Sequence, residues 1–244
     1  MKRPWGFLPP SRMKVIVTGA SKGIGKGIAS FLAMDGFEVG LLARSRDLLE
    51  DLRQSIEEQG GKCFAVSCDL RDPDNTAAAI AATVDAIGGV DALVNNAGLV
   101  IRKNIFDISI AEWRAMIDTN INGVFFATRA VLPYFKSQQR GHIVNISSIS
   151  GKVPLPGGSG YAATKYAVTG FSQSLFHEVR DFGIKVTTIY PGSIDSESHR
   201  HDANADHAWK VTPAEVGVAV RDVLRTSAGT VISEVEIRPL RKGS

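Results

Sequence analysis

The stretch KVIVTGASKGIG, from Lys14 to Gly25, decides the fold. Its first residues form a short β-branched run, which predicts a buried strand, and a turn rich in glycine follows at once. Glycine in such a turn permits positive φ and lets the backbone approach a ligand closely. A helix is expected next, and its first turn would present free N–H groups and the positive end of its dipole to an anion. The spacing G-x-x-x-G-x-G departs from the commoner G-x-G-x-x-G pattern, so an ordinary structural turn is the alternative.

The rest of the chain alternates short apolar runs with longer helical patterns. Strands are expected at residues 14–19, 37–44, 63–70, 90–98, 141–148, 184–192 and 230–239. Helices are expected at residues 26–36, 47–60, 72–89, 110–136 and 213–224, and from residue 161 onward. The strands are continuously apolar, as in a sheet covered on both faces. This order predicts an α/β fold of one domain, a Rossmann-type doubly wound parallel sheet of seven strands with helices on both faces.

Length and composition limit the functional classes. A chain of 244 residues, 44% apolar and 22% charged, is typical of a soluble globular protein. The net charge of +3 comes without Lys/Arg runs, so no nucleic-acid or membrane partner is expected, and no apolar run approaches the ~18–20 residues that cross a bilayer. The two cysteines, Cys63 and Cys68, cannot form a disulfide framework, and buried thiols in a reducing cytoplasm are expected.

The two ends of the chain are not expected to carry the function. Residues 1–12 are basic and contain three prolines, without the apolar stretch of a secretory signal. We expect them to be a flexible extension or a leader sequence. Residues 13–244 are expected to form the single ligand-binding domain.

The loops at the carboxyl ends of the strands are the expected ligand site of such a sheet. After the second strand, NAD-binding sites usually carry an acid for the ribose 2′-hydroxyl, but this chain has Ala43 and Arg44 there. Lys22 lies in the glycine loop. Two cations without a carboxylate suit a 2′-phosphate, which favours NADP(H) over NAD(H). The alternative is that both are ordinary solvated surface residues.

A second motif, Tyr161-Ala-Ala-Thr-Lys165, sets a phenol and an ammonium four residues apart. On a helix this spacing places both side chains on one face. An ammonium beside a phenol favours the phenolate, so Lys165 is expected to lower the pKa of Tyr161 and make it a stronger acid. A chance pairing is the alternative for these two residues taken alone.

Four motifs in order resemble those of the short-chain dehydrogenases/reductases, and the resemblance covers residues 13–240. They are TGASKGIG at 18–25, NNAG at 95–98, YAATK at 161–165 and YPG at 190–192. The family also has a serine thirteen positions before the tyrosine, which here is Ser148. Its asparagine in the long helix after NNAG is matched by Asn120. The resemblance therefore implies a catalytic tetrad of Asn120, Ser148, Tyr161 and Lys165 in an NADP-preferring reductase of carbonyls or 3-oxoacyl groups.

The resemblance also implies roles. Tyr161 would be the general acid in reduction and the base in oxidation, and Ser148 would hydrogen-bond the substrate oxygen. Lys165 would hold the nicotinamide ribose, while Asn120 would kink its helix and hold a water that connects Lys165 to solvent. Cofactor contacts are expected from Gly19, Ser21, Lys22, Gly23, Ile24, Arg44, Asp69, Asn96, Ala97, Gly98, Tyr161, Lys165, Pro191, Gly192, Ile194 and Ser196.

The substrate is left open between a ketone or aldehyde, a 3-oxoacyl thioester and a sugar-like carbonyl. The segments 151–160 and 195–210 are expected to choose among them. The second segment holds His199, His201, Asp202, Asp206 and His207. We expect a polar substrate lid there and no metal site, because the reaction needs no metal.

Assembly and direction are open as well. Family members commonly pair through the helix that bears Tyr161, so a homodimer or homotetramer is expected. Two other functions remain as alternatives. One is an NAD(P)-linked alcohol dehydrogenase working mainly in oxidation, and the other is a non-catalytic regulator that senses NADP.

Overall fold

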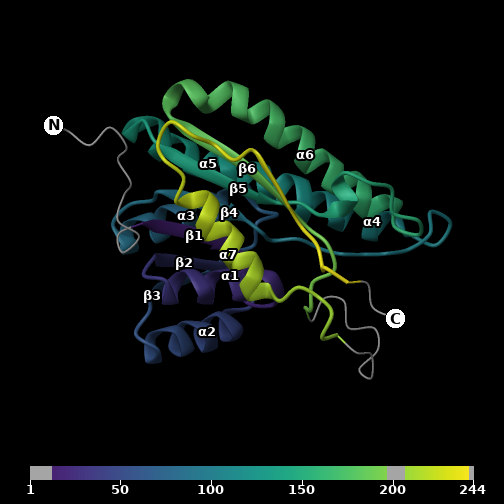
Figure 1. The fold of residues 1–244 in the computed structure, drawn as a ribbon, viewed down its shortest axis with the longest axis horizontal. Coiled ribbons are helices and arrows are strands. Elements are labelled where there is room, and N and C mark those ends of the chain that lie inside the picture. The colour runs from purple at the N-terminus through teal and green to yellow at the C-terminus, as the bar shows by residue number, and fades with distance from the viewer. Residues whose placement is uncertain (1–12, 197–206, 242–244) are drawn as a thin grey trace.

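The computed structural model describes residues 13–196 and 207–241. Seven parallel strands form one sheet in the order β3-β2-β1-β4-β5-β6-β7 (Figure 1). The strands are β1 (Lys14–Thr18), β2 (Glu38–Ala43), β3 (Lys62–Ser67), β4 (Ala92–Asn95), β5 (Gly141–Ile146), β6 (Ile184–Pro191) and β7 (Glu234–Ile237). The predicted doubly wound parallel sheet is confirmed. The prediction for residues 1–12 and most of the expected lid, residues 197–206, lie outside the described ranges.

Helices cover both faces of this sheet. They are α1 (Gly23–Met34), α2 (Arg46–Glu58), α3 (Pro73–Ile87), α4 (Ile110–Ile117), α5 (Gly123–Gln138), α6 (Ser159–Val179) and α7 (Pro213–Leu224). The described residues also form three short turns, the π-helical η2 (Asp118–Asn122) and the 3₁₀ turns η3 (Ile149–Gly151) and η4 (Arg180–Phe182). Figure 1 shows α7 lying beside α1. No helix in the described ranges is long and apolar enough to span a membrane.

Alternate residues of the strands build two cores, one on each face. Val15 and Val17 of β1 pack with α1, α2 and α7, whereas Ile16 between them packs with α3, α5 and α6. Successive side chains of a strand point to opposite faces, so a continuously apolar strand serves both cores. The two edge strands differ from the expectation. In β3 and β7 exposed positions alternate with half-buried ones and no position is fully buried, because helices cover these strands less completely.

The helix expected over residues 110–136 is broken once, at Asn120, where the family resemblance implied a kink. It is interrupted by the π-helical turn η2, which separates α4 from α5. Asn120 lies in this turn, and its side chain bonds both backbone groups of Leu99 on the loop after β4. These bonds draw the turn toward the sheet, which explains why the regular α-helical repeat breaks there. The last strand is also shorter than expected, since β7 covers only residues 234–237.

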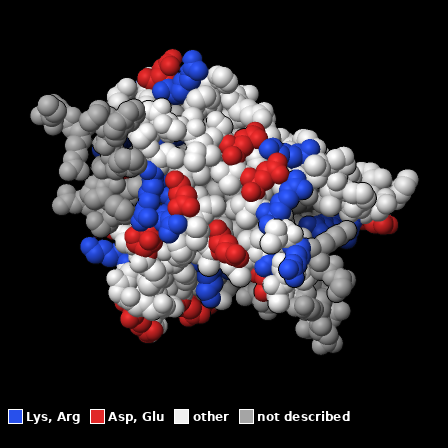
Figure 2. All heavy atoms as spheres, viewed as in Figure 1, with Lys and Arg blue, Asp and Glu red and all other residues white. Residues whose placement is uncertain are grey.

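The surface carries no large area of one charge on the face in view. Figure 2 shows basic and acidic side chains intermixed there. Many of them form ion pairs, such as Arg53 with Glu50 and Glu57 on α2.

A buried histidine gives the fold a testable pH dependence. His142 of β5 is buried, with Nε2 2.7 Å from Oγ1 of Thr187 on β6. Burial, helped by the charge of Lys185, lowers the pKa of His142 from 6.5 to about 3. The unfolded chain takes up a proton near pH 6.5 while the folded chain does not, so stability falls as the pH drops through this window. We expect a loss of about 2 kcal/mol between pH 7 and pH 5.

Urea denaturation at the two pH values measures this loss. A His142→Gln variant keeps a polar side chain without the titrating imidazole, so its stability should change much less over the same interval. Equal losses in the variant and the unchanged protein would contradict the assignment to His142.

Candidate active site

A cavity of about 210 Å³ lies at the carboxyl ends of the strands, where the strand order reverses between β1 and β4. This is the position at which doubly wound sheets bind their ligands. The predicted contacts that line it are Gly19, Ser21, Lys22, Gly23, Ile24, Arg44, Asp69, Asn96, Ala97, Gly98, Tyr161, Lys165 and Ser196. Pro191, Gly192 and Ile194 are not in the lining of this cavity, and neither are Asn120 and Ser148.

Gly19 and Gly25 of the glycine loop lie so close to neighbouring backbone that a residue with a Cβ would not fit at either position. Gly19 has a φ of 66°, and a Cβ built on it would lie 2.7 Å from Cα of Ala97. A Cβ on Gly25 would lie 2.2 Å from the carbonyl oxygen of Gly19. The Asn96 amide nitrogen donates to the carbonyl oxygens of Thr18 and Gly19 at 3.0 and 3.3 Å. The loop after β4 thus holds the glycine loop in place and leaves its backbone facing the cavity.

Helix α1 offers its amino end to the same space. Its N-cap residue is Lys22, and within the described ranges no side chain caps its first N–H groups. Its first turn contains no acidic residue. A helix start of this kind, with a cation beside it, is a ready site for a phosphate group.

Besides Lys165, three cationic side chains line the cavity, Lys22, Arg44 and Arg71. Arg71 forms a bidentate ion pair with Asp69, with Nε 2.9 Å from Oδ1 and one terminal nitrogen 2.6 Å from Oδ2. Hydrogen bonds from Arg71, supported by the charge of Arg44, lower the pKa of Asp69 to about 2. Sequence reasoning missed Arg71, although its place two residues after Asp69 at a strand end was an available signal.

Three members of the predicted tetrad, Ser148, Tyr161 and Lys165, lie close together. Tyr161 and Lys165 lie on α6 and are each only 6% exposed. The Lys165 ammonium donates to the carbonyl oxygen of Ile146 at 2.9 Å and lies 5.9 Å from the centroid of the Tyr161 ring. Ser148, which caps η3, lies near enough to the Tyr161 hydroxyl to act on its pKa. The turn after β5 and the start of α6 therefore bring a phenol, a hydroxyl and an ammonium together.

The pKa of Tyr161 is shifted opposite to the sequence prediction. Burial raises it, and the hydrogen bond from Ser148 and the charge of Arg102 only partly oppose this rise. Burial also lowers the pKa of Lys165 to about 8. The predicted lowering of the Tyr161 pKa by Lys165 is therefore wrong. Desolvation disfavours both the phenolate of Tyr161 and the ammonium of Lys165. Its effect on the two pKa values is larger than the electrostatic attraction that the four-residue spacing allows.

Asn120 uses its side chain to fix the loop after β4 against α6. Its Oδ1 accepts from the backbone N–H of Leu99 at 2.7 Å. Its Nδ2 donates to the Leu99 carbonyl at 2.9 Å and to Thr164 Oγ1 at 3.0 Å. The expected break in its helix is present as η2, while the water-holding role stays a prediction. Thr164, on α6, was not anticipated as its partner.

The segment after β6 is held at the edge of the site by backbone bonds. Gly192 donates its N–H to the Ile237 carbonyl of β7 at 2.8 Å, and Ile194 bridges to Val211. Ser196 alone of the four predicted contacts in this segment reaches the cavity.

Of the five histidine and aspartate residues noted in segment 195–210, one lies within the described residues. His199, His201, Asp202 and Asp206 lie outside the described residues, whereas His207 is described and lies 2.7 Å from the Lys210 ammonium. Among residues 13–196 and 207–241, no cluster of His, Cys, Asp and Glu could hold a metal ion.

Comparisons with known proteins identify the family of this chain. Residues 13–207 match the family described as short chain dehydrogenase. An uncharacterized oxidoreductase of Staphylococcus epidermidis is 34% identical over 225 residues, which cover 92% of this chain and 96% of the relative.

Two solved structures show the same arrangement of the chain. One is an alcohol dehydrogenase from the archaeon Thermococcus sibiricus, complexed with 5-hydroxy-NADP, with a TM-score of 0.87, 28% identity and coverage of 96% of this chain and 99% of the other. A serine dehydrogenase complexed with NADP+ has a TM-score of 0.87, 32% identity and coverage of 95% and 97%. With matches over this much of its length, the protein belongs to the short-chain dehydrogenase family of oxidoreductases.

Proposed function

We propose that the protein is an NADP(H)-dependent oxidoreductase that interconverts a small carbonyl compound and its alcohol. The observation that carries the proposal is the closeness of Ser148, Tyr161 and Lys165, beside a cavity that the glycine loop and the cations Lys22, Arg44 and Arg71 also line. The cofactor, when bound, supplies or accepts the hydride. The protein's part is then to bind, to orient and to move a proton.

The residues present fit a dinucleotide. The close approach of Gly19 to Ala97 leaves backbone in place of side chains where a pyrophosphate would lie, and α1 points its first N–H groups at the same place. Lys165 would hold the ribose next to the nicotinamide. Pro191, Gly192 and Ile194 would flank the nicotinamide ring from the segment after β6.

Tyr161 would be the general acid in reduction. Because burial raises its pKa, the hydroxyl keeps its proton at neutral pH and can give it to the substrate oxygen. Ser148 would donate a hydrogen bond to the same oxygen as negative charge develops. In oxidation the proton moves the other way, from the substrate hydroxyl to the phenolate.

The charges at the adenosine end support NADP(H) over NAD(H). Lys22 and Arg44 would contact the 2′-phosphate, and no carboxylate occupies the position after β2. The one acid that lines the cavity among the described residues, Asp69, is neutralised by its bidentate pair with Arg71. The two NADP-bound relatives described above support the same choice.

Arg71 gives a first prediction about cofactor choice. Arg71→Gln would leave the Asp69 carboxylate uncompensated near the 2′-phosphate, so the KM for NADPH should rise about tenfold and the KM for NADH should change little. Steady-state kinetics with both cofactors measure this. The double variant Asp69→Asn/Arg71→Gln also removes the negative charge of residue 69, so it should recover most of the NADPH affinity. An equal rise for both cofactors would show that Arg71 acts only on the shape of the site.

The substrate class rests on the surroundings of Tyr161 and on the relatives. The relatives named above as alcohol and serine dehydrogenases act on small hydroxyl compounds by their names, which supports a small alcohol or carbonyl here. The experiment is an NADPH-oxidation screen over ketones, aldehydes, 3-oxoacyl thioesters and sugar carbonyls, run beside NADH. Turnover of at least one class, faster with NADPH, is expected. No turnover across the panel, or a preference for NADH, would count against the proposal.

We also propose a homodimer or homotetramer that uses α5 and α6. Phe125 of α5 and Tyr166 of α6 are each 44% exposed. Phe125 stacks edge-on with Phe171 of α6 at 6.5 Å. Exposed aromatic side chains on neighbouring helices are typical of a protein interface.

A further inference from the structure

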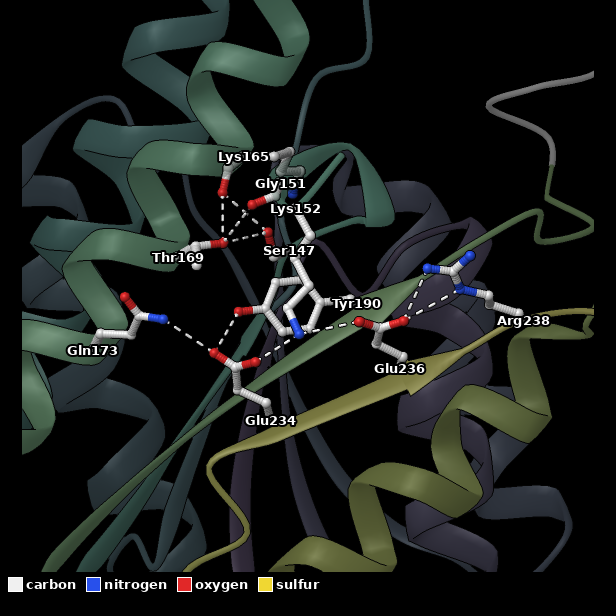
Figure 3. A network of polar contacts seen from close by, with 10 residues as sticks. All are labelled: Ser147, Gly151, Lys152, Lys165, Thr169, Gln173, Tyr190, Glu234, Glu236 and Arg238. Atoms are coloured by element: carbon white, nitrogen blue, oxygen red, sulfur yellow. Dashed lines mark hydrogen bonds and ion pairs between the residues drawn. The ribbon is translucent and has the colours of Figure 1, made fainter. Parts of the chain in front are cut away.

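Lys152 joins the turn that carries Ser148 to the last strand of the sheet (Figure 3). It follows directly after η3, the turn that Ser148 caps. Its ammonium lies 2.6 Å from Glu234 Oε2 and 3.0 Å from Glu236 Oε1, both on β7. The same ammonium lies 4.3 Å from the centroid of the Tyr190 ring on β6. The Lys152 side chain thus connects this turn to β7, the edge strand, and to its neighbour β6.

The contacts continue from these strands to α6. The Tyr190 hydroxyl donates to Glu234 Oε1 at 3.2 Å. Gln173, one helical turn after Thr169, donates to the same Glu234 oxygen at 3.1 Å. Figure 3 shows these side chains converging on Glu234 from α6, β6 and the turn.

A second group of contacts joins the same turn directly to α6 at the backbone of Lys165. Thr169 Oγ1 lies 3.1 Å from the Lys165 carbonyl oxygen and 3.3 Å from the Gly151 carbonyl oxygen, and Ser147 Oγ donates to the Lys165 carbonyl at 3.1 Å. The turn also packs tightly there, because a Cβ on Gly151 would lie 2.7 Å from the Lys165 carbonyl oxygen. A shift of the turn would therefore move Ser148 relative to the residues of α6.

We propose that Lys152 is a positioning residue, which fixes the distance between Ser148 and the Tyr161–Lys165 pair by anchoring η3 to β7. This rests on the proposed function, since it assigns a role within that reaction. Lys152 is not part of the cavity lining, so it acts through the backbone of the turn. Partly exposed ion pairs contribute little to stability, whereas a displacement of about 1 Å in a catalytic group can cost about 100-fold in rate.

The experiment replaces Lys152 with methionine, which keeps the length of the side chain but removes the charge. We expect kcat to fall about tenfold, with the dissociation constant for NADPH unchanged within about twofold. The matched control is Lys62→Met. Lys62 pairs with Glu38 at 3.5 Å between β3 and β2, at the opposite edge of the sheet, and this variant should keep the full kcat.

Two further variants separate positioning from a general structural role. Lys152→Arg keeps the charge and should retain most of the kcat. The exchanged pair Lys152→Glu/Glu236→Lys should recover a large part of the kcat that Lys152→Glu alone loses.

The outcomes distinguish this inference from the proposed function. If Lys152→Met lowers only the melting temperature and leaves the kcat of the folded enzyme intact, Lys152 is merely structural and the inference is overturned. A matching loss of NADPH affinity would overturn it too, because the effect would then lie in cofactor binding. If the unchanged protein reduces no carbonyl at all, the proposed function fails first.

Discussion

Tyr161→Phe is expected to lower the kcat of carbonyl reduction by about 10²–10⁴-fold. The substitution removes a single oxygen from a side chain that is only 6% exposed, so the ring can keep its packing. Without that hydroxyl, the developing oxyanion has no side chain in place to give it a proton, and water must replace it. Ser148 and the bound cofactor would still be present, which is why some activity should remain.

The loss should appear in kcat and not in cofactor affinity. NADPH consumption gives kcat, and fluorescence titration gives the NADPH dissociation constant of the same variant. Tyr166→Phe is the matched control, because Tyr166 lies on the same helix but is 44% exposed. Its kcat should match that of the unchanged protein. Full activity of the Tyr161→Phe enzyme would show that Tyr161 is not the proton donor.

Reversal of cofactor preference is the second large effect. The double variant Lys22→Ser/Arg44→Asp removes both cations and places a carboxylate where NAD-binding sites usually have one. Each charge-assisted hydrogen bond contributes about 1.5–3 kcal/mol, so the NADPH-to-NADH ratio of kcat/KM should fall at least about 100-fold. Most of the change should be in the KM for NADPH.

The control for this experiment is Lys26→Ser. Lys26 is an exposed cation on α1, four residues after Lys22, and it is not part of the cavity lining. Its removal should leave the ratio almost unchanged. If Lys26→Ser changed the ratio as much as the double variant does, the preference would come from the general charge of this surface and not from a 2′-phosphate site.

The parts of the structure that depend on local sequence were predicted well. A short, largely apolar run such as residues 14–19 predicts a buried strand. Seven such runs alternate with helical segments, and this order leads to one parallel sheet. Strand ends of a parallel sheet meet at one edge, so residues in the loops after strands, such as Lys22 and Arg44, could be assigned to one cavity. The structure lines the cavity with both.

The features that were missed depend on contacts between distant residues. The π-helical turn forms around Asn120, whose partners Leu99 and Thr164 lie 21 and 44 positions away. The family resemblance implied a kink at Asn120, but no local pattern in residues 110–136 indicates its π-helical form or these two partners. The Lys152 network likewise joins residues up to 84 positions apart.

The pKa of Tyr161 shows a different limit. The spacing of Tyr161 and Lys165 on one helix was read correctly as proximity, yet the direction of the shift is set by burial under elements from the whole chain. The spacing of two residues on a helix predicts that their side chains lie close together. It does not predict how completely the folded protein shields them from water.

The most direct test of the central claim is to follow a labelled hydride from the cofactor to the substrate. NADPH deuterated at the transferring C4 position is incubated with the protein and the best carbonyl of the panel, and the alcohol is analysed by mass spectrometry. We predict one deuterium on the former carbonyl carbon with the unchanged protein and almost none with Tyr161→Phe. An alcohol formed without deuterium from either C4 position, or equal labelled product from both proteins, would contradict the account.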